Sequence, residues 1–131
     1  MKINSIEQEI IKTYINKNKQ DRIIWELGNT EKRMQIMLSR FAGPALFKSN
    51  CLYPVNYMSS NEMEKAFMEL SGVQDVYFIG QSYIGEISLK EAVNRANTGE
   101  ICIIYCGNGI GYYQGEEDSG KPPRFLLMQK G

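Results

Sequence analysis

The chain has 131 residues, of which 43% are hydrophobic and 23% charged, and its formal net charge is zero. This length and composition predict one globular domain spanning residues 1–131. The sequence contains no histidine, which excludes Ser-His-Asp and Cys-His catalysis and the histidine-based zinc motifs. No apolar run is long enough to span a bilayer, and acidic residues stand where a signal peptide would be apolar, so we expect a cytoplasmic protein.

Apolar residues at helical spacing predict three helices in the first third of the chain. A capping box of Ser5 and Gln8 begins the first helix. The second is short and ends at Gly28, and the third follows Thr30 and ends at Gly43. The inner faces of these helices carry Ile6, Ile10, Ile11, Tyr14, Ile15, Ile23, Ile24, Leu27, Met34, Met37, Leu38 and Phe41.

The middle of the chain changes from helical to strand character. Residues 51–55 form a short extended piece, which Pro54 keeps out of a central strand. A capping box at Ser59 begins a helix that ends at Gly72. Residues 75–79 are then a continuous apolar run of strand length.

A helix and a second apolar run follow that strand. Ser88 caps the helix, which ends before Gly99, and residues 101–106 are apolar at every position, as in a strand covered on both faces. A strand, a helix and a strand within about thirty residues predict a βαβ unit, with parallel strands and a right-handed crossover.

The glycine-rich stretch IYCGNGIGYYQGEE, residues 104–117, could be a phosphate-binding loop or a turn between strands. A phosphate-binding loop leads directly into a helix, and a P-loop also needs a lysine, whereas strand-like aromatic residues follow these glycines. Asn108–Gly109 between two β-rich runs is a strong hairpin signal, because both residues tolerate positive φ. We therefore predict a type I′ turn and an antiparallel pair of strands at 101–106 and 110–114.

The last predicted strand is RFLLMQ, residues 124–129, which follows a polar loop. The pattern as a whole predicts an α+β fold in which amino-terminal helices pack on a mixed sheet of about four strands. This sheet would contain the βαβ unit and a carboxyl-terminal hairpin or meander.

Three cysteines, an odd number, fit a reducing compartment better than a disulfide framework. Cys102 and Cys106 would share one face of a strand, about 13 Å apart at ~3.3 Å per residue, which is too far for a disulfide. Their spacing, with no further cluster, is not a zinc signature. We expect buried, unreactive thiols and no metal site.

The charges are unevenly divided along the chain. Residues 1–48 hold nine basic and five acidic residues, whereas residues 49–131 hold six basic and ten acidic residues. Two poles of opposite charge can steer charged partners. Alternatively, these are the charged residues that any solvent-exposed helix surface carries. The basic helices lack interleaved aromatic residues and carry acids among the bases, so we do not expect nucleic acid as a partner.

The end of the predicted hairpin combines acidic and aromatic residues. Carboxylates around aromatic side chains favour a basic protein partner, although a loop can also be acidic merely for solubility. The predicted partner-binding residues are Glu86, Tyr112, Tyr113, Glu116, Glu117 and Asp118.

Two stretches resemble segments of a group of small bacterial proteins. NKQDRIIWELGNTEKRMQIMLSRFAG, residues 18–43, resembles their amino-terminal pattern, and ICIIYCGNGIGYYQGE, residues 101–116, resembles their carboxyl-terminal part. Such proteins resemble the immunity proteins encoded beside secreted or contact-delivered toxins. The resemblance implies a protein-binding role and carries over no catalytic residue and no cofactor.

These observations favour an immunity protein that binds and neutralises one cognate toxin domain, for example a basic nuclease-type domain. We expect no cofactor, no metal and no membrane partner. The alternative is a small enzyme or ligand-binding domain that uses carboxylates and tyrosines in a pocket beside the sheet.

Overall fold

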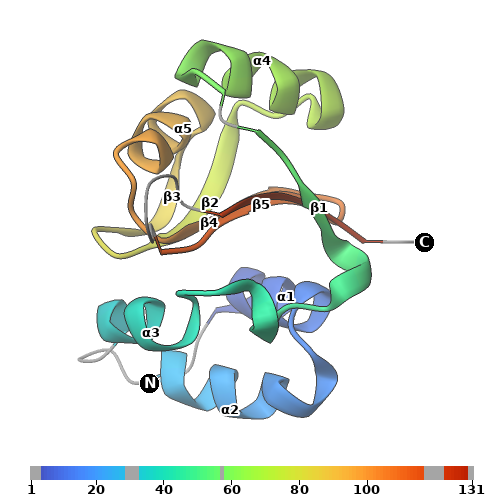
Figure 1. Cartoon of the computed structure of the whole chain (residues 1–131), viewed down its shortest axis with the longest axis vertical. Coiled ribbons are helices and arrows are strands. Elements are labelled where there is room, and N and C mark those ends of the chain that lie inside the picture. The colour runs from blue at the N-terminus through green and yellow to red at the C-terminus, as the bar shows by residue number, and fades with distance from the viewer. Residues whose placement is uncertain (1–3, 29–32, 57, 117–122, 130–131) are drawn as a thin grey trace.

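The computed structural model describes residues 4–28, 33–56, 58–116 and 123–129. Its helices and strands form three layers, with one sheet in the middle (Figure 1). The α+β class predicted from the sequence is therefore confirmed. Within the described ranges, no helix has both the length and the apolar character needed to cross a membrane.

The amino-terminal helices cover one face of the sheet, and two later helices cover the other (Figure 1). The first group is α1 (Ser5–Tyr14), α2 (Lys17–Leu27) and α3 (Arg33–Arg40), and the second is α4 (Ser60–Ser71) and α5 (Leu89–Asn97). Short 3₁₀ turns at Pro44–Leu46 and Ser49–Cys51 lead from the first group into the sheet.

Side-chain caps mark where α1 and α4 begin. The α1 cap is Asn4, one residue before the predicted Ser5, and its Oδ1 accepts a hydrogen bond from the Glu7 N–H at 2.8 Å. The predicted capping box of Ser59 and Glu62 is confirmed at α4, which ends at Gly72 with a φ of 71°. The predicted cap of the third helix, Thr30, lies outside the described residues.

The strands pair in a single six-stranded antiparallel sheet with the order β1-β6-β5-β4-β2-β3. The prediction of a mixed sheet of about four strands is therefore wrong in its strand count and arrangement. The strands are β1 (Leu52–Pro54), β2 (Asp75–Gly80), β3 (Ile84–Ser88), β4 (Cys102–Gly107), β5 (Ile110–Gln114) and β6 (Arg124–Met128).

The strand that the sequence did not reveal is β3, and it reverses the expected parallel pairing. β3 forms a hairpin with β2, so the chain has already turned back when α5 begins. β4 then pairs antiparallel with β2. A helical crossover does exist, but it joins β3 to β4, which run in the same direction on either side of β2.

The hairpin at Asn108–Gly109 is confirmed. β4 and β5 pair antiparallel from Cys102 opposite Gln114 to Gly107 opposite Ile110. Asn108 has a φ of 53° and Gly109 a φ of 78°, the left-handed conformation that the predicted turn requires. Because β5 is a strand at Gly111, the glycine-rich stretch is not a phosphate-binding loop.

The expected burial of the cysteines is also confirmed. Cys102 and Cys106 lie in the hydrophobic cluster between the sheet and α4–α5, and Cys51 lies in the cluster on the other face. None of the three forms a disulfide. Burial raises the pKa of each thiol, which keeps it protonated and unreactive.

We expect Gly111→Ala to lower the free energy of unfolding by about 1–3 kcal/mol, because a Cβ there would lie 2.6 Å from the Ile104 carbonyl oxygen. Urea unfolding measures the change. Gly43→Ala is the matched control, since a Cβ at Gly43 meets nothing within 4 Å. Equal losses in the two variants would contradict the close approach at Gly111.

Candidate functional site

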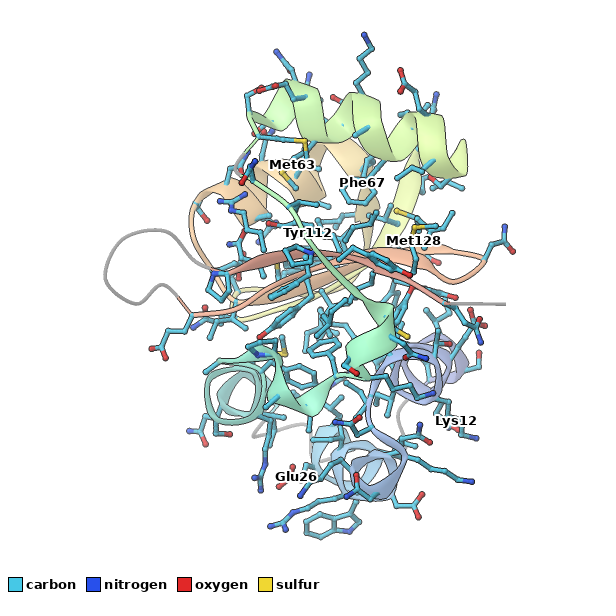
Figure 2. The ribbon with its side chains drawn as sticks, turned by 45° about the vertical axis from the view of Figure 1, so that its right-hand side comes forward. Lys12, Glu26, Met63, Phe67, Tyr112 and Met128 are labelled. Carbon is cyan, nitrogen blue, oxygen red and sulfur yellow. The ribbon has the colours of Figure 1, made fainter. Side chains whose placement is uncertain are left out.

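Tyr112 and Tyr113 do not lie on a surface, which corrects the expectation that they contact a partner. Both side chains are buried, on opposite faces of the sheet. The Tyr112 hydroxyl donates to Gln114 Oε1 at 2.7 Å, and Figure 2 shows its ring beneath Phe67 of α4. The Tyr113 hydroxyl donates to the Phe41 carbonyl at 2.5 Å. Both tyrosines are therefore core residues.

The predicted acidic residues do not form one surface either. Glu116 is exposed just beyond the end of β5. Glu86 is exposed on the edge strand β3, at the level of Gly111 near the start of β5. The sheet register therefore separates these two residues both along and across the strands. Glu117 and Asp118 lie outside the described residues.

Glu86 instead lines an open groove of about 740 Å³ between the β3 edge of the sheet and α1. We call this site the acidic groove and define it by the carboxylates and tyrosines in its lining. These are Glu9, Asp75, Tyr77, Glu86 and Tyr105.

Strand register brings the groove residues together from distant parts of the sequence. Glu86 on β3 pairs with Tyr77 on β2, which pairs with Tyr105 on β4. Directly opposed residues of antiparallel strands point to the same face, so these three side chains form a row across the sheet. Asp75, two residues before Tyr77 on β2, lies on this face as well.

A buried carboxylate holds Tyr77 in place. Glu7 of α1 is 1% exposed and accepts a hydrogen bond from the Tyr77 hydroxyl at 2.6 Å. It also forms an ion pair with Arg33 of α3. The Asn4 side chain donates to the Tyr77 hydroxyl at 2.9 Å. Glu7 therefore holds Tyr77 close to α1 and α3, and its carboxylate is already bound to Tyr77 and Arg33.

Tyr105 is held in a similar way by Glu9, a second carboxylate of α1. Its hydroxyl donates a hydrogen bond to Glu9, whose side chain is exposed to the groove. The Tyr14 ring packs edge-on against Tyr105, with centroids 6.0 Å apart. Tyr77 is 7% and Tyr105 6% exposed, so the groove has a rigid, nearly buried tyrosine floor, and its exposed side is formed by the carboxylates.

The tyrosines stay protonated at neutral pH. Burial, and next the hydrogen bond to Glu7, raise the pKa of Tyr77 to about 12. Burial, and next the hydrogen bond to Glu9, raise the pKa of Tyr105 to about 12. They therefore act as neutral surfaces, and the charge of the groove comes from its carboxylates.

The carboxylates are spread along the groove and do not converge on one point. Among the described residues, no group of three or more acidic or cysteine side chains could hold a metal ion. The groove therefore suits an extended cationic group, such as an arginine or lysine side chain, which can pair with the exposed carboxylates and reach only the edges of the tyrosines.

Sequence reasoning missed four of the five groove residues and one prominent surface residue. The groove depends on pairing across β3, and no local pattern reveals such pairing. The surface residue is Trp25 on α2, which is 77% exposed. The helical spacing of Ile23 and Leu27 does place Trp25 outside their buried stripe, so this signal was present in the sequence.

The chain matches no protein-family model, no curated protein and no solved structure. The resemblance to immunity proteins therefore stays a prediction.

As the pH rises in the alkaline range, we expect the free energy of unfolding to decrease less steeply in Tyr77→Phe than in the original chain. The folded-state pKa of Tyr77 is raised, so the stability that this group contributes is complete below about pH 10 and is lost as the pH rises through about 12. Removing the group should reduce the slope in this window by up to about 1.4 kcal/mol per pH unit. Urea unfolding between neutral and alkaline pH measures both slopes. Parallel slopes would contradict the buried hydrogen-bonded state of Tyr77.

Proposed function

We propose that this protein is an immunity-type inhibitor that binds and neutralises a cognate bacterial toxin domain. Its acidic groove receives a basic segment of that domain. The observation that carries this proposal is the row of Glu86, Tyr77 and Tyr105 across the sheet, bordered by two further carboxylates.

The groove has the features of a prepared protein-binding site. Tyr77 and Tyr105 are held by hydrogen bonds and packing, so little side-chain freedom is lost when a partner binds. Glu9, Asp75 and Glu86 are exposed and can attract a basic partner before contact. These features support a rigid receptor for a cationic side chain.

The proposed interface lies at the β3 edge of the sheet, whereas the sequence predicted it at the end of the hairpin. Glu86 is the predicted residue that the two sites share. Glu116 remains an exposed acid at the hairpin end and is kept as a separate candidate contact.

A small-molecule site in the same groove is the second candidate. The volume of about 740 Å³ is within the usual range of ligand pockets, and the lining combines carboxylates with aromatic rings. A small organic cation would use the same contacts as a basic side chain. The two candidates differ in whether a protein or a small molecule binds tightly.

We expect the toxin domain encoded next to this gene to bind with a nanomolar or lower dissociation constant, about 12 kcal/mol of binding free energy. Asp75→Asn combined with Glu86→Gln should slow association several-fold, and the effect should shrink as salt rises, because exposed charges act through a screened field. Stopped-flow mixing at two salt concentrations measures the rates. The matched control is Glu64→Gln with Glu69→Gln on α4, across the sheet from the groove.

An association rate unchanged by the groove variant would remove the groove from the interface. A parallel variant with serine at positions 116, 117 and 118 tests the hairpin end in the same assay. If no neighbouring gene product binds and calorimetry instead detects arginine or spermidine binding that Glu86→Gln abolishes, the small-molecule candidate replaces the immunity proposal.

A further inference from the structure

Trp25 is exposed to an unusual degree for the largest apolar side chain. It is 77% exposed, compared with 45% for Leu70 and 37% for Tyr53, the other large exposed hydrophobic residues of the described chain. The opposite side of α2 is packed into the core through Ile23 and Leu27. Exposed tryptophan contributes strongly to protein interfaces because it buries a large rigid surface at little entropic cost.

A basic groove lies along the Lys19–Arg22 side of the same helix. It has a volume of about 310 Å³ between α2, the end of α3 and the turn at Pro44–Leu46. Lys19, Arg22 and Arg40 supply its charge. Arg22 lines the groove and stands three residues before Trp25, which is outside the lining, so Arg22 is the residue between the groove and the indole on the helix surface.

The groove also has an apolar part and a fixed cation. Leu46, which is partly exposed, and Ala45, which is exposed, contribute carbon surface to its lining. Glu26 accepts two hydrogen bonds from the Arg40 guanidinium, at 3.0 and 2.8 Å. The Nε of Arg22 lies 3.7 Å from the same carboxylate. This arrangement holds Arg40 in position, whereas Lys19 and Arg22 are exposed to solvent.

We infer that Trp25 with Lys19, Arg22 and Arg40 forms a second interaction surface, which binds an acidic protein segment carrying an apolar anchor residue. We call it the Trp25 face. Carboxylates of the segment pair with the exposed cations Lys19 and Arg22, and its apolar side chain packs against the indole. This surface is independent of the proposed toxin interface.

The charge pattern favours a peptide over a nucleic acid. Asp21 and Glu26 stand among the bases of α2, where they would repel a continuous phosphate backbone. A peptide can place its few carboxylates at the cations and avoid both acids. A single aromatic residue also offers one stacking position, whereas single-stranded nucleic acid is usually bound by several.

The Trp25 face and the acidic groove are in different parts of the molecule. α2 is the helix farthest from the sheet in Figure 1, and Figure 2 shows Glu26 at that outer end. The acidic groove lies against the sheet itself, between α1 and the β3 edge. One molecule can therefore bind a basic and an acidic partner at the same time.

Trp25 is the sole tryptophan of the chain, so its fluorescence reports directly on this surface. A random short-peptide library displayed on phage is selected against the full-length protein, and enriched tryptophan-free peptides are synthesised. We expect them to combine Asp or Glu with Leu or Phe. Their titration should shift the Trp25 emission to shorter wavelength, because the indole leaves water.

Charge variants then locate the binding. Lys19→Gln combined with Arg22→Gln should raise the dissociation constant of the peptides at least about tenfold, which corresponds to about 1.4 kcal/mol of binding free energy. Lys65→Gln with Lys90→Gln removes the same charge from exposed sites on α4 and α5 and should leave binding unchanged. Trp25→Ala, followed by calorimetry, should weaken binding by a similar factor, and circular dichroism verifies that each variant is folded.

Three results would overturn the inference. The first is a selection that yields no acidic peptides, or peptides whose affinity the Lys19/Arg22 variant does not change. The second is a thymidine oligonucleotide that shifts the emission at lower concentration than the peptides, which would assign the surface to nucleic acid. The third is the same shift on raising the protein concentration alone, which would make a second copy of this chain the occupant.

Discussion

The central sheet is covered on both faces, and this two-sided burial determines most of the remaining structure. Residues 102–106 of β4 are all buried, with alternate side chains entering the two hydrophobic clusters. Polar groups that must reach water are therefore confined to the sheet edges and the outer sides of the helices. The acidic groove accordingly lies where the partly exposed edge strand β3 approaches α1.

Local sequence signals predicted the elements better than their arrangement. The turn at Asn108–Gly109 and the cap at Ser59 depend on neighbouring residues, and the structure confirms both. The direction of β4 depends on β3, whose five residues are all partly exposed or exposed and include Gly85. An all-apolar strand usually indicates a parallel sheet, but here helices on both faces bury an antiparallel one.

The candidate site could be predicted only in part, for the same reason. The sequence predicts Glu86 as an acidic partner-binding residue, but its neighbours are set by cross-strand register, which needs the position of β3. Tyr112 and Tyr113 are adjacent in sequence, so on a strand they must point to opposite faces, and both faces are buried. Trp25 could have been found from helical spacing alone, because it falls outside the buried stripe of α2.

The three thiols are placed so that their accessibility reports which side of the sheet has opened. Cys51 lies on the side of the sheet covered by α1–α3, and Cys102 and Cys106 lie on the side covered by α4 and α5. A thiol reacts as the thiolate and only when a reagent reaches it, so each is protected for as long as its side stays closed. The alkylation rate of Cys51 therefore reports how often the α1–α3 layer detaches. The alkylation rates of Cys102 and Cys106 report the same for the α4–α5 layer. The two halves of the core can therefore be followed separately through cysteines that the chain already has.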